Sequence, residues 1–214
     1  MKSYKVSAAE LKNFTKTVFE KTGLQESDAQ AIAELLVHAD VRGVSSHGVI
    51  RMKPYIEKIN GGGASLKSTY PVVQETANTA VIDAEGGLGA VAGEKAVKIA
   101  REKAKNSLIS IVSVKNSNHF GMAGHWAMKL AGEDCIGFAC SNTDPSMAPP
   151  GVTIPFIGNN PFSFAFAAGE KYPEVCVDMA TSAAAFGKAK AYALAGKPIP
   201  EGWLLDKQGN PTTE

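Results

Sequence analysis

The sequence lacks a surplus of charge of either sign. Its 214 residues include 22 lysines and arginines and 21 aspartates and glutamates, for a formal net charge of +1. The two signs are interspersed and no basic stripe alternates with aromatic residues, which argues against nucleic acid as a partner. No apolar run approaches the ~20 residues that span a bilayer, and residues 1–5 contain no apolar signal-peptide core. We therefore expect no nucleic-acid partner and no membrane association.

Cysteine is also scarce, with only Cys135, Cys140 and Cys176 in the chain. An odd number of cysteines without C-x-x-C spacing argues against a disulfide framework and against a zinc cluster. Each cysteine lies in an apolar run, so we expect buried, reduced thiols in strands. Reduced thiols indicate a reducing compartment, and a cytoplasmic location is the prediction.

The apolar content is sufficient for one large domain or two small ones. Hydrophobic residues make up 44% of the chain and charged residues 20%, values typical of a globular fold. Residues 1–68 are predicted to form a small helical unit. Capping boxes at Ser7–Glu10 and Ser27–Gln30 each precede apolar residues at helical spacing, and a third helical pattern covers 52–59.

Residues 69–214 alternate between strand and helix patterns, which is typical of an α/β domain. Strands are expected at 70–74, 79–83, 108–114, 136–141, 162–166 and 174–178. Helices are expected at 92–106, 122–131 and 183–195.

A glycine-rich loop follows the second of these strands. Gly87, Gly89 and Gly93 nearly match the dinucleotide-binding fingerprint, in which glycines allow a pyrophosphate to approach a helix N-terminus. The third glycine is one residue late, and the next strand delivers Lys115 instead of an acidic residue for the ribose. We favour a tight strand-to-helix turn and keep the loop as a second candidate for the cofactor site.

One polar loop holds His47 and Arg51 at positions i and i+4. If Ser46 caps a helical turn, both side chains project from one face. An imidazole beside a guanidinium suits proton transfer to a carbonyl whose neighbouring carboxylate is held bidentately. Pro54 requires the helical turn to end and restart nearby. The alternative, a capping serine with an exposed histidine and a surface arginine, is about equally compatible with these residues.

A second polar loop, 116–121, holds Asn118 and His119 directly after an apolar strand. A later strand ends at Ser141 and is followed by Asp144. If both strands are parallel, their carboxyl ends place His119 and Asp144 on one rim of the sheet, where α/β proteins bind ligands. Turn formation alone is the alternative, because Asn, Ser, Asp and Gly all favour turns. His38 and His125 lie on predicted helices and are expected to be structural.

Other chemistries have weaker support. His47, His119 and Asp144 could form a scattered metal site, but no H-x-x-x-H or H-E-x-x-H spacing is present, so no metal ligand is assigned. There is no G-x-S-x-G elbow, and no cysteine lies in a polar loop, which argues against nucleophilic catalysis.

Several ordered motifs resemble the malate/L-lactate dehydrogenase type 2 family. They are the segments 42–49 (RGVSSHGV), 118–121 (NHFG), 158–162 (GNNPF), 178–182 (DMATS), 199–203 (IPEGW) and 206–213 (DKQGNPTT). The similarity extends over essentially the whole chain and is specific for the family, although not for one substrate.

The resemblance implies a fold that the motifs do not show by themselves. It is a largely antiparallel, non-Rossmann sheet domain flanked by helices, which binds NAD or NADP and works as a homodimer. This implication argues further against the glycine loop as the cofactor site.

The resemblance also implies roles for particular residues. His47 or His119 is the proton donor and acceptor, and Arg51 holds the substrate carboxylate. Asp144, which the strand-end argument makes a further catalytic candidate, matches a position that lines the cofactor. Further substrate and cofactor contacts are expected from the matching motifs: Ser46 and Asn118 for the substrate, and Thr143, Asn160, Asp178, Met179 and Ala180 for the cofactor.

The predicted function is hydride transfer between NAD(P) and a small 2-hydroxy acid/2-oxo acid pair of the malate, lactate, sulfolactate or ureidoglycolate type. Family members continue beyond the motif at 206–213, so the 69–214 domain is expected to be incomplete at its C-terminal end. A catalytically silent binding or dimerisation module is the alternative, and a metal-dependent hydrolase is a further one.

Overall fold

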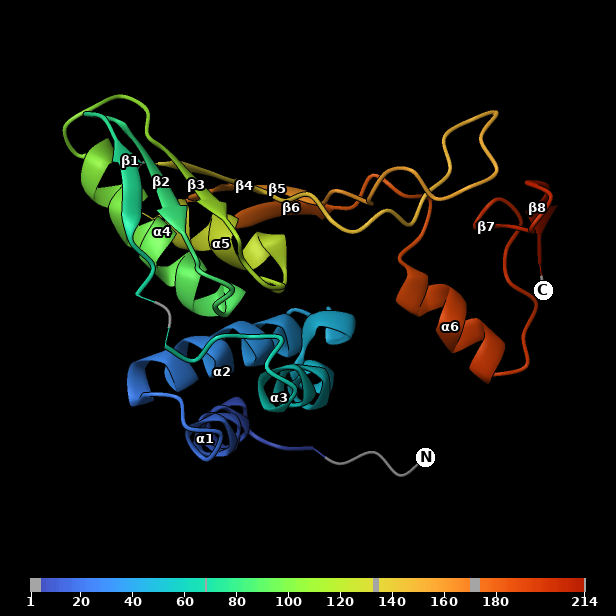
Figure 1. Cartoon of the computed structure of the whole chain (residues 1–214), viewed down its shortest axis with the longest axis horizontal. Helices are drawn as coiled ribbons and strands as arrows, with labels where there is room; N and C mark the ends of the chain where they lie inside the picture. The colour runs from blue at the N-terminus through green and yellow to red at the C-terminus, as the bar shows by residue number, and fades with distance from the viewer. Residues whose placement is uncertain (1–4, 68, 133–134, 170–173, 214) are drawn as a thin grey trace.

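The structure is a computed structural model that describes residues 5–67, 69–132, 135–169 and 174–213. Figure 1 shows the helices of residues 8–60 on one side of the helices α4 (Gly89–Ala104) and α5 (Ala123–Leu130), with the main strands on the other side. The central helix pair therefore separates the N-terminal helices from the strands.

The N-terminal unit consists of α1 (Ala8–Glu20), α2 (Glu26–Val41) and α3 (Met52–Asn60). The capping box at Ser7 is confirmed, since Ser7 accepts from the Glu10 N–H and Glu10 bonds back to Ser7. The second predicted box is wrong. Helix α2 begins at Glu26 after Gln25, and Ser27 lies inside the helix with its hydroxyl directed at Asp28.

The core of this unit is shared with the following domain. Phe19, Ile32 and Leu35 are fully buried and belong to one apolar cluster with Val97 of α4 and Trp126 of α5. Burial of these side chains stabilises the fold by roughly 1.5–3 kcal/mol each. The expected domain boundary lies at residue 68, which is outside the described residues.

The strands form three small sheets within the described residues. In the first, β1 (Val72–Glu75) pairs antiparallel with β2 (Thr79–Asp83), and β2 pairs parallel with β3 (Ile111–Lys115) across the α4 crossover. The second contains only antiparallel pairs, with the strands β4 (Ile136–Cys140), β5 (Phe162–Phe166) and β6 (Val175–Met179). A two-stranded sheet pairs β7 (Leu204–Leu205) with β8 (Pro211–Thr212). The prediction of an α/β fold with mainly antiparallel pairing is confirmed, with β2–β3 as the exception.

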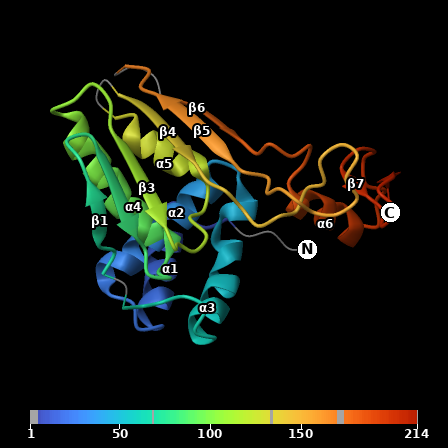
Figure 2. The same cartoon turned by 45° about the horizontal axis from the view of Figure 1, so that its top comes forward.

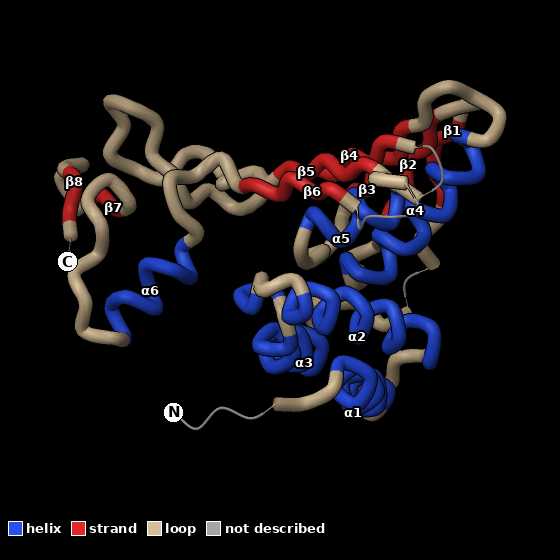
Figure 3. The backbone as a smooth tube through the Cα atoms, turned by 180° about the vertical axis from the view of Figure 1, so that it is seen from behind, coloured by secondary structure: helices blue, strands red, loops and turns tan. Residues whose placement is uncertain are grey.

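The β4–β5–β6 sheet has two different faces because side chains alternate along each strand. Ser163 and Ala165 are fully buried on the face that packs against α5. The opposite face is exposed and carries only apolar side chains among its large residues: Ile136, Phe138, Phe164, Phe166, Val175, Val177 and Met179. Beyond this sheet, α6 (Phe186–Leu194) and the β7–β8 hairpin extend away from the body, as Figures 2 and 3 show.

The expectation of buried cysteines is wrong. All three thiols are free, but Cys135 and Cys140 are exposed and Cys176 is half-buried. Cys140 lies on β4 and Cys176 on β6, whereas Cys135 precedes β4. An apolar run in sequence does not bury every residue when only one face of the sheet is covered.

Candidate active site

His47 lies in the connection between α2 and α3, which consists of two short 3-10 turns at Ser45–His47 and Val49–Arg51. Asp40 of α2 fixes this connection, since its carboxylate accepts from the Val49 N–H at 2.8 Å. A Cβ at Gly48 would lie 1.9 Å from the Asp40 carboxylate, so only glycine allows the close approach.

The predicted cap at Ser46 is wrong, because Val44 precedes the first turn and Ser46 lies inside it. Ser46 instead bonds to its neighbours: its hydroxyl lies 3.0 Å from His47 Nδ1, and its carbonyl accepts from Arg51 Nε at 2.7 Å. Pro54 is the third residue of α3, where a helical N–H has no intrahelical acceptor, so it does not interrupt the helix.

His119 lies in the loop between β3 and α5. The Asn118 amide donates to the carbonyls of Gly86 and Gly87, at 2.7 and 3.1 Å, and anchors this loop to the turn after β2. Gly121 has φ +81°, and a Cβ there would lie within 2.7 Å of Leu35 on α2. The loop is thereby held against the N-terminal unit.

The structure brings His47 and His119 together. Their rings stack with centroids 5.5 Å apart and an interplanar angle of 22°. Arg51 lies close enough to lower the pKa of both imidazoles. The two polar loops therefore bring two imidazoles and one guanidinium together within the protomer.

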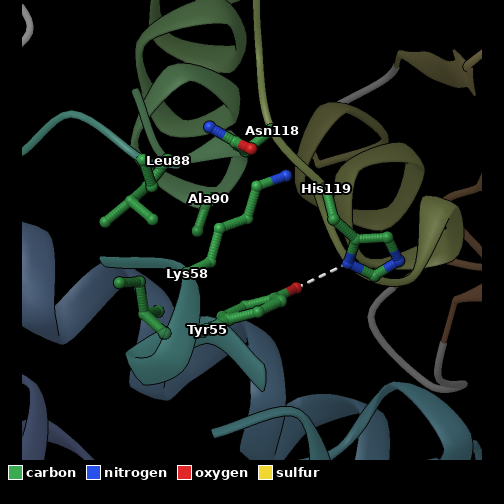
Figure 4. A pocket seen from close by; sticks show the side chains of 9 residues that line it. Tyr55, Lys58, Leu88, Ala90, Asn118 and His119 are labelled. Atoms are coloured by element: carbon green, nitrogen blue, oxygen red, sulfur yellow. Dashed lines mark hydrogen bonds between the residues drawn. The ribbon is translucent and has the colours of Figure 1, made fainter. Parts of the chain in front are cut away.

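The sequence interpretation missed Tyr55. The Tyr55 hydroxyl lies 2.6 Å from His119 Nδ1, a hydrogen bond drawn in Figure 4. Because the Gly121 N–H also points at this nitrogen, at 3.3 Å, Nδ1 is an acceptor and the neutral ring carries its proton on Nε2. Burial raises the pKa of Tyr55 well above its ordinary value, which keeps its hydroxyl protonated. Arg51 and Tyr55 are four residues apart, and this spacing is the signal that could have identified Tyr55.

Burial and neighbouring cations keep the two imidazoles neutral. Burial first, and then His47, Arg51 and Lys58, together lower the pKa of His119 to about 4, although part of the side chain reaches solvent. The pKa of His47 is lowered by burial first and by Arg51 second, while Asp178 opposes the change.

The prediction that His119 and Asp144 share one rim of a parallel sheet is wrong. The strands before them, β3 and β4, belong to different sheets, and Asp144 is exposed. Asp178, at the end of β6, is the carboxylate near His47. It accepts from the Gly124 N–H at the start of α5, at 2.9 Å, and burial raises its pKa.

Other predicted cofactor residues gather at one end of the second sheet. Because β4 and β6 both run antiparallel to β5, the segments after β4 and β6 meet the segment before β5. Thr143 donates its hydroxyl to Asn159, at 2.8 Å, and its N–H to the Asn160 side chain, at 3.1 Å. The Thr181 hydroxyl donates to the Asn159 carbonyl at 3.0 Å. Met179 and Ala180 lie between Asp178 and Thr181, so this polar edge continues toward His47.

The glycine loop is explained by packing. A Cβ at Gly89 would lie 2.3 Å from the Asn118 carbonyl oxygen, and one at Gly93 would lie 2.6 Å from the Trp126 ring. These contacts support the tight strand-to-helix turn that the sequence favoured.

A pocket lies beside the Tyr55–His119 hydrogen bond, between α3, the first turn of α4 and the His119 loop (Figure 4). Its polar side chains are those of Lys58 and Asn118 and of the Tyr55–His119 pair, and the rest of its lining is apolar. Within the described ranges, no helix is long and apolar enough to cross a membrane. In the same ranges, no three or more His, Cys, Asp or Glu side chains are grouped so that they could hold a metal ion.

Comparison with known proteins places this geometry in a family. The family described as malate/L-lactate dehydrogenase matches residues 6–214. The malate dehydrogenase of Pyrococcus horikoshii is 43% identical over 202 residues, which are 94% of this chain and 56% of the relative. The L-sulfolactate dehydrogenase of Methanocaldococcus jannaschii is 41% identical over 197 residues, 92% of this chain and 57% of the relative.

A solved structure shows the same fold. The malate dehydrogenase from Entamoeba histolytica superposes with a TM-score of 0.93 at 34% identity, covering 99% of this chain and 59% of that one. The chain thus spans somewhat more than half the length of these relatives. Since the family match extends from residue 6 to residue 214, the chain belongs to the malate/L-lactate dehydrogenase family.

Proposed function

We propose that this chain carries the proton-transfer and carboxylate-binding groups of a nicotinamide-dependent dehydrogenase that interconverts 2-hydroxy acids and 2-oxo acids. The observation that carries the proposal is the stacking of His47 on His119, at 5.5 Å, beside Arg51. The names of the relatives support it, because malate and L-sulfolactate are both 2-hydroxy acids.

In this proposal, Arg51 binds the substrate carboxylate through paired N–H groups, the geometry for which a guanidinium is suited. The Arg51 Nε already donates to the Ser46 carbonyl, which fixes the orientation of the planar group. The carboxylate is therefore held next to the two imidazoles, with the adjacent C2 oxygen facing them.

We assign different tasks to the two histidines. Burial, His47, Arg51 and Lys58 all lower the pKa of His119, so a positive charge on this imidazole is unfavourable. Neutral His119 presents Nε2–H as a hydrogen-bond donor to the C2 oxygen. His47 is the ring with a nearby carboxylate, because Asp178 opposes the lowering of its pKa by burial and Arg51. We therefore assign to His47 the transfer of the proton to or from that oxygen.

The segments around Asp178 fit a nicotinamide cofactor. Thr143 and Asn160 provide polar groups at the end of the second sheet, and Met179 is 51% exposed and offers an apolar surface to a flat ring. Thr143, Asn160, Met179 and Ala180 would hold NAD or NADP. The bound cofactor supplies or accepts the hydride at the substrate C2.

The test is a fluorescence titration of the chain with NADH and with NADPH, followed by an assay of reduced-nicotinamide absorbance with a panel of 2-oxo acids. We expect saturable binding of at least one cofactor and oxidation of the bound cofactor by a 2-oxo acid. Saturable binding of neither cofactor would contradict the proposal and favour a silent binding module. Sedimentation of the same sample tests the homodimer that we also propose.

A further inference from the structure

Lys58 is a cation in the pocket that the proposed reaction does not use. It lies on α3, lines the pocket beside Tyr55 and His119, and is near enough to His119 to lower the pKa of that imidazole. Figure 4 shows its side chain extending from α3 toward Asn118. Among the described residues, Lys58 forms no ion pair, whereas Lys53 on the same helix pairs with Glu57 at 3.7 Å.

The surroundings of Lys58 leave its charge available to a ligand. The pocket wall around it is formed by the apolar side chains of Ile32, Ala64, Leu88 and Ala90. The first turn of α4 also contributes to the wall, at a helix end that favours negative charge. The neighbouring polar residue, Asn118, donates its side-chain N–H groups to the Gly86 and Gly87 carbonyls.

The position of Lys58 relative to Arg51 suggests what ligand it contacts. Arg51 directly precedes α3 and Lys58 lies on its last turn, with Tyr55 between them in the chain. Both cations are close enough to the His119 ring to add to the lowering of its pKa by burial. A short 2-oxo acid whose first carboxylate is bound at Arg51 and whose C2 oxygen meets the imidazoles would direct its far end into the pocket. A negative group at that end meets the Lys58 ammonium.

We propose that Lys58 is the specificity-determining residue for a second anionic group on the substrate. The site then prefers 2-hydroxy or 2-oxo acids that carry a second carboxylate or sulfonate over acids with one carboxylate. This inference rests on the proposed function. It distinguishes malate, a dianion at neutral pH, from lactate, which has the same reacting carbon and lacks the second charge.

The experiment compares malate and lactate on the wild-type chain, on Lys58→Met and on the matched control Lys53→Met. Binding is followed by NMR shifts of the His119 ring in the presence of the cofactor, and kcat/KM is measured for both acids. One charge-assisted contact discriminates by about tenfold or more. We expect Lys58→Met to reduce malate affinity and kcat/KM by at least about tenfold and to change lactate by less than twofold. Lys53→Met should change neither acid.

A charge-conserving variant separates recognition from structure. Lys58→Arg should keep most of the preference for malate, since the cation remains. Equal losses for malate and lactate in Lys58→Met, or an unchanged malate affinity, would overturn the role of Lys58 while hydride transfer continued. Absence of malate binding by the wild-type chain would overturn the Lys58 inference together with the proposed function.

Discussion

The His47–His119 pair and the His38–His125 pair both join the N-terminal helices to the following domain, but their contacts differ. His47 and His119 stack at 5.5 Å, and each uses Nδ1 in a hydrogen bond to a hydroxyl, from Ser46 and Tyr55 respectively. His38 on α2 and His125 on α5 bond directly to each other, with their Nδ1 atoms 2.8 Å apart.

The difference shows how the same side chain serves two purposes. In the buried pair one Nδ1 must carry a proton and the other must accept it, so both rings cannot be charged in this geometry. His125 is only 4% exposed, and within the described part its Nε2 is buried without a hydrogen-bond partner. In the stacked pair His119 lines a pocket, whereas the bonded pair joins the helices α2 and α5.

The largest effect that separates the two pairs concerns turnover. His47→Ala should lower kcat by about 10²–10⁴-fold, because general acid–base transfer contributes that factor. His119→Ala should lower it at least tenfold, and His38→Asn by no more than about threefold. Steady-state assays with a 2-oxo acid and reduced cofactor measure these values. Equal losses at His47 and His38 would contradict the division of roles.

For the free energy of unfolding, the bonded pair should matter more than the stacked pair. His125→Ala removes a buried ring whose centroid lies 4.7 Å from that of the Trp126 ring, and it leaves His38 without its hydrogen-bond partner. We expect the free energy of unfolding to fall by about 2–4 kcal/mol. His119→Ala, at a partly exposed ring, should cost less than about 1 kcal/mol. Urea titrations of both variants provide the comparison, and similar losses would show that both pairs are structural.

Mild acid should weaken the fold through the bonded pair. Burial, His38 and Lys129 lower the pKa of His125 to about 3, and burial with Arg42 lowers that of His38 against the opposing charge of Glu174. The unfolded chain binds these protons near pH 6.5, so stability from His125 is complete above that pH and falls as the pH drops toward 3.

The expected slope is up to about 1.4 kcal/mol per pH unit for one histidine. The free energy of unfolding measured between pH 6.5 and 4.5 should therefore fall more steeply in wild type than in His125→Phe, which keeps a ring but cannot titrate. Parallel pH dependences in the two proteins would rule out His125 as the source.

The smallest effect is a change of pKa without a change of fold. Removing the Arg51 charge in Arg51→Met should raise the pKa of His47 and His119, because the guanidinium lowers both. The pKa of His38 and His125 should not move, since their cationic neighbours are Arg42 and Lys129. NMR titration of the four imidazoles tests this, and a shift confined to the bonded pair would contradict the assignment.

Much of the secondary structure follows from local patterns in the sequence. The capping box at Ser7 begins α1, and the turn at 76–78 joins β1 to β2, because these signals act between residues close in the chain. The polar loops that hold His47 and His119 could also be identified from the sequence, since both interrupt apolar segments.

Pairing between distant segments could not be predicted in the same way. The sequence placed Asp144 beside His119 by assuming that β3 and β4 are parallel neighbours, whereas Asp178 is the acid near His47. Tyr55 and Lys58 were missed because a tyrosine and a lysine on an amphipathic helix are ordinary core and surface residues. Only the position of the His119 loop gives them their contacts.

The sequence by itself determined the helices, the strands and the residue types of the site, because hydrophobic period and capping depend on near neighbours. The tertiary structure alone decided which histidines stack, which bond to each other and which carboxylate lies near His47. Those contacts join α2, α3 and the His119 loop through shared burial around Leu35 and Trp126. Burial is a property of the packed core, and no stretch of neighbouring residues specifies it.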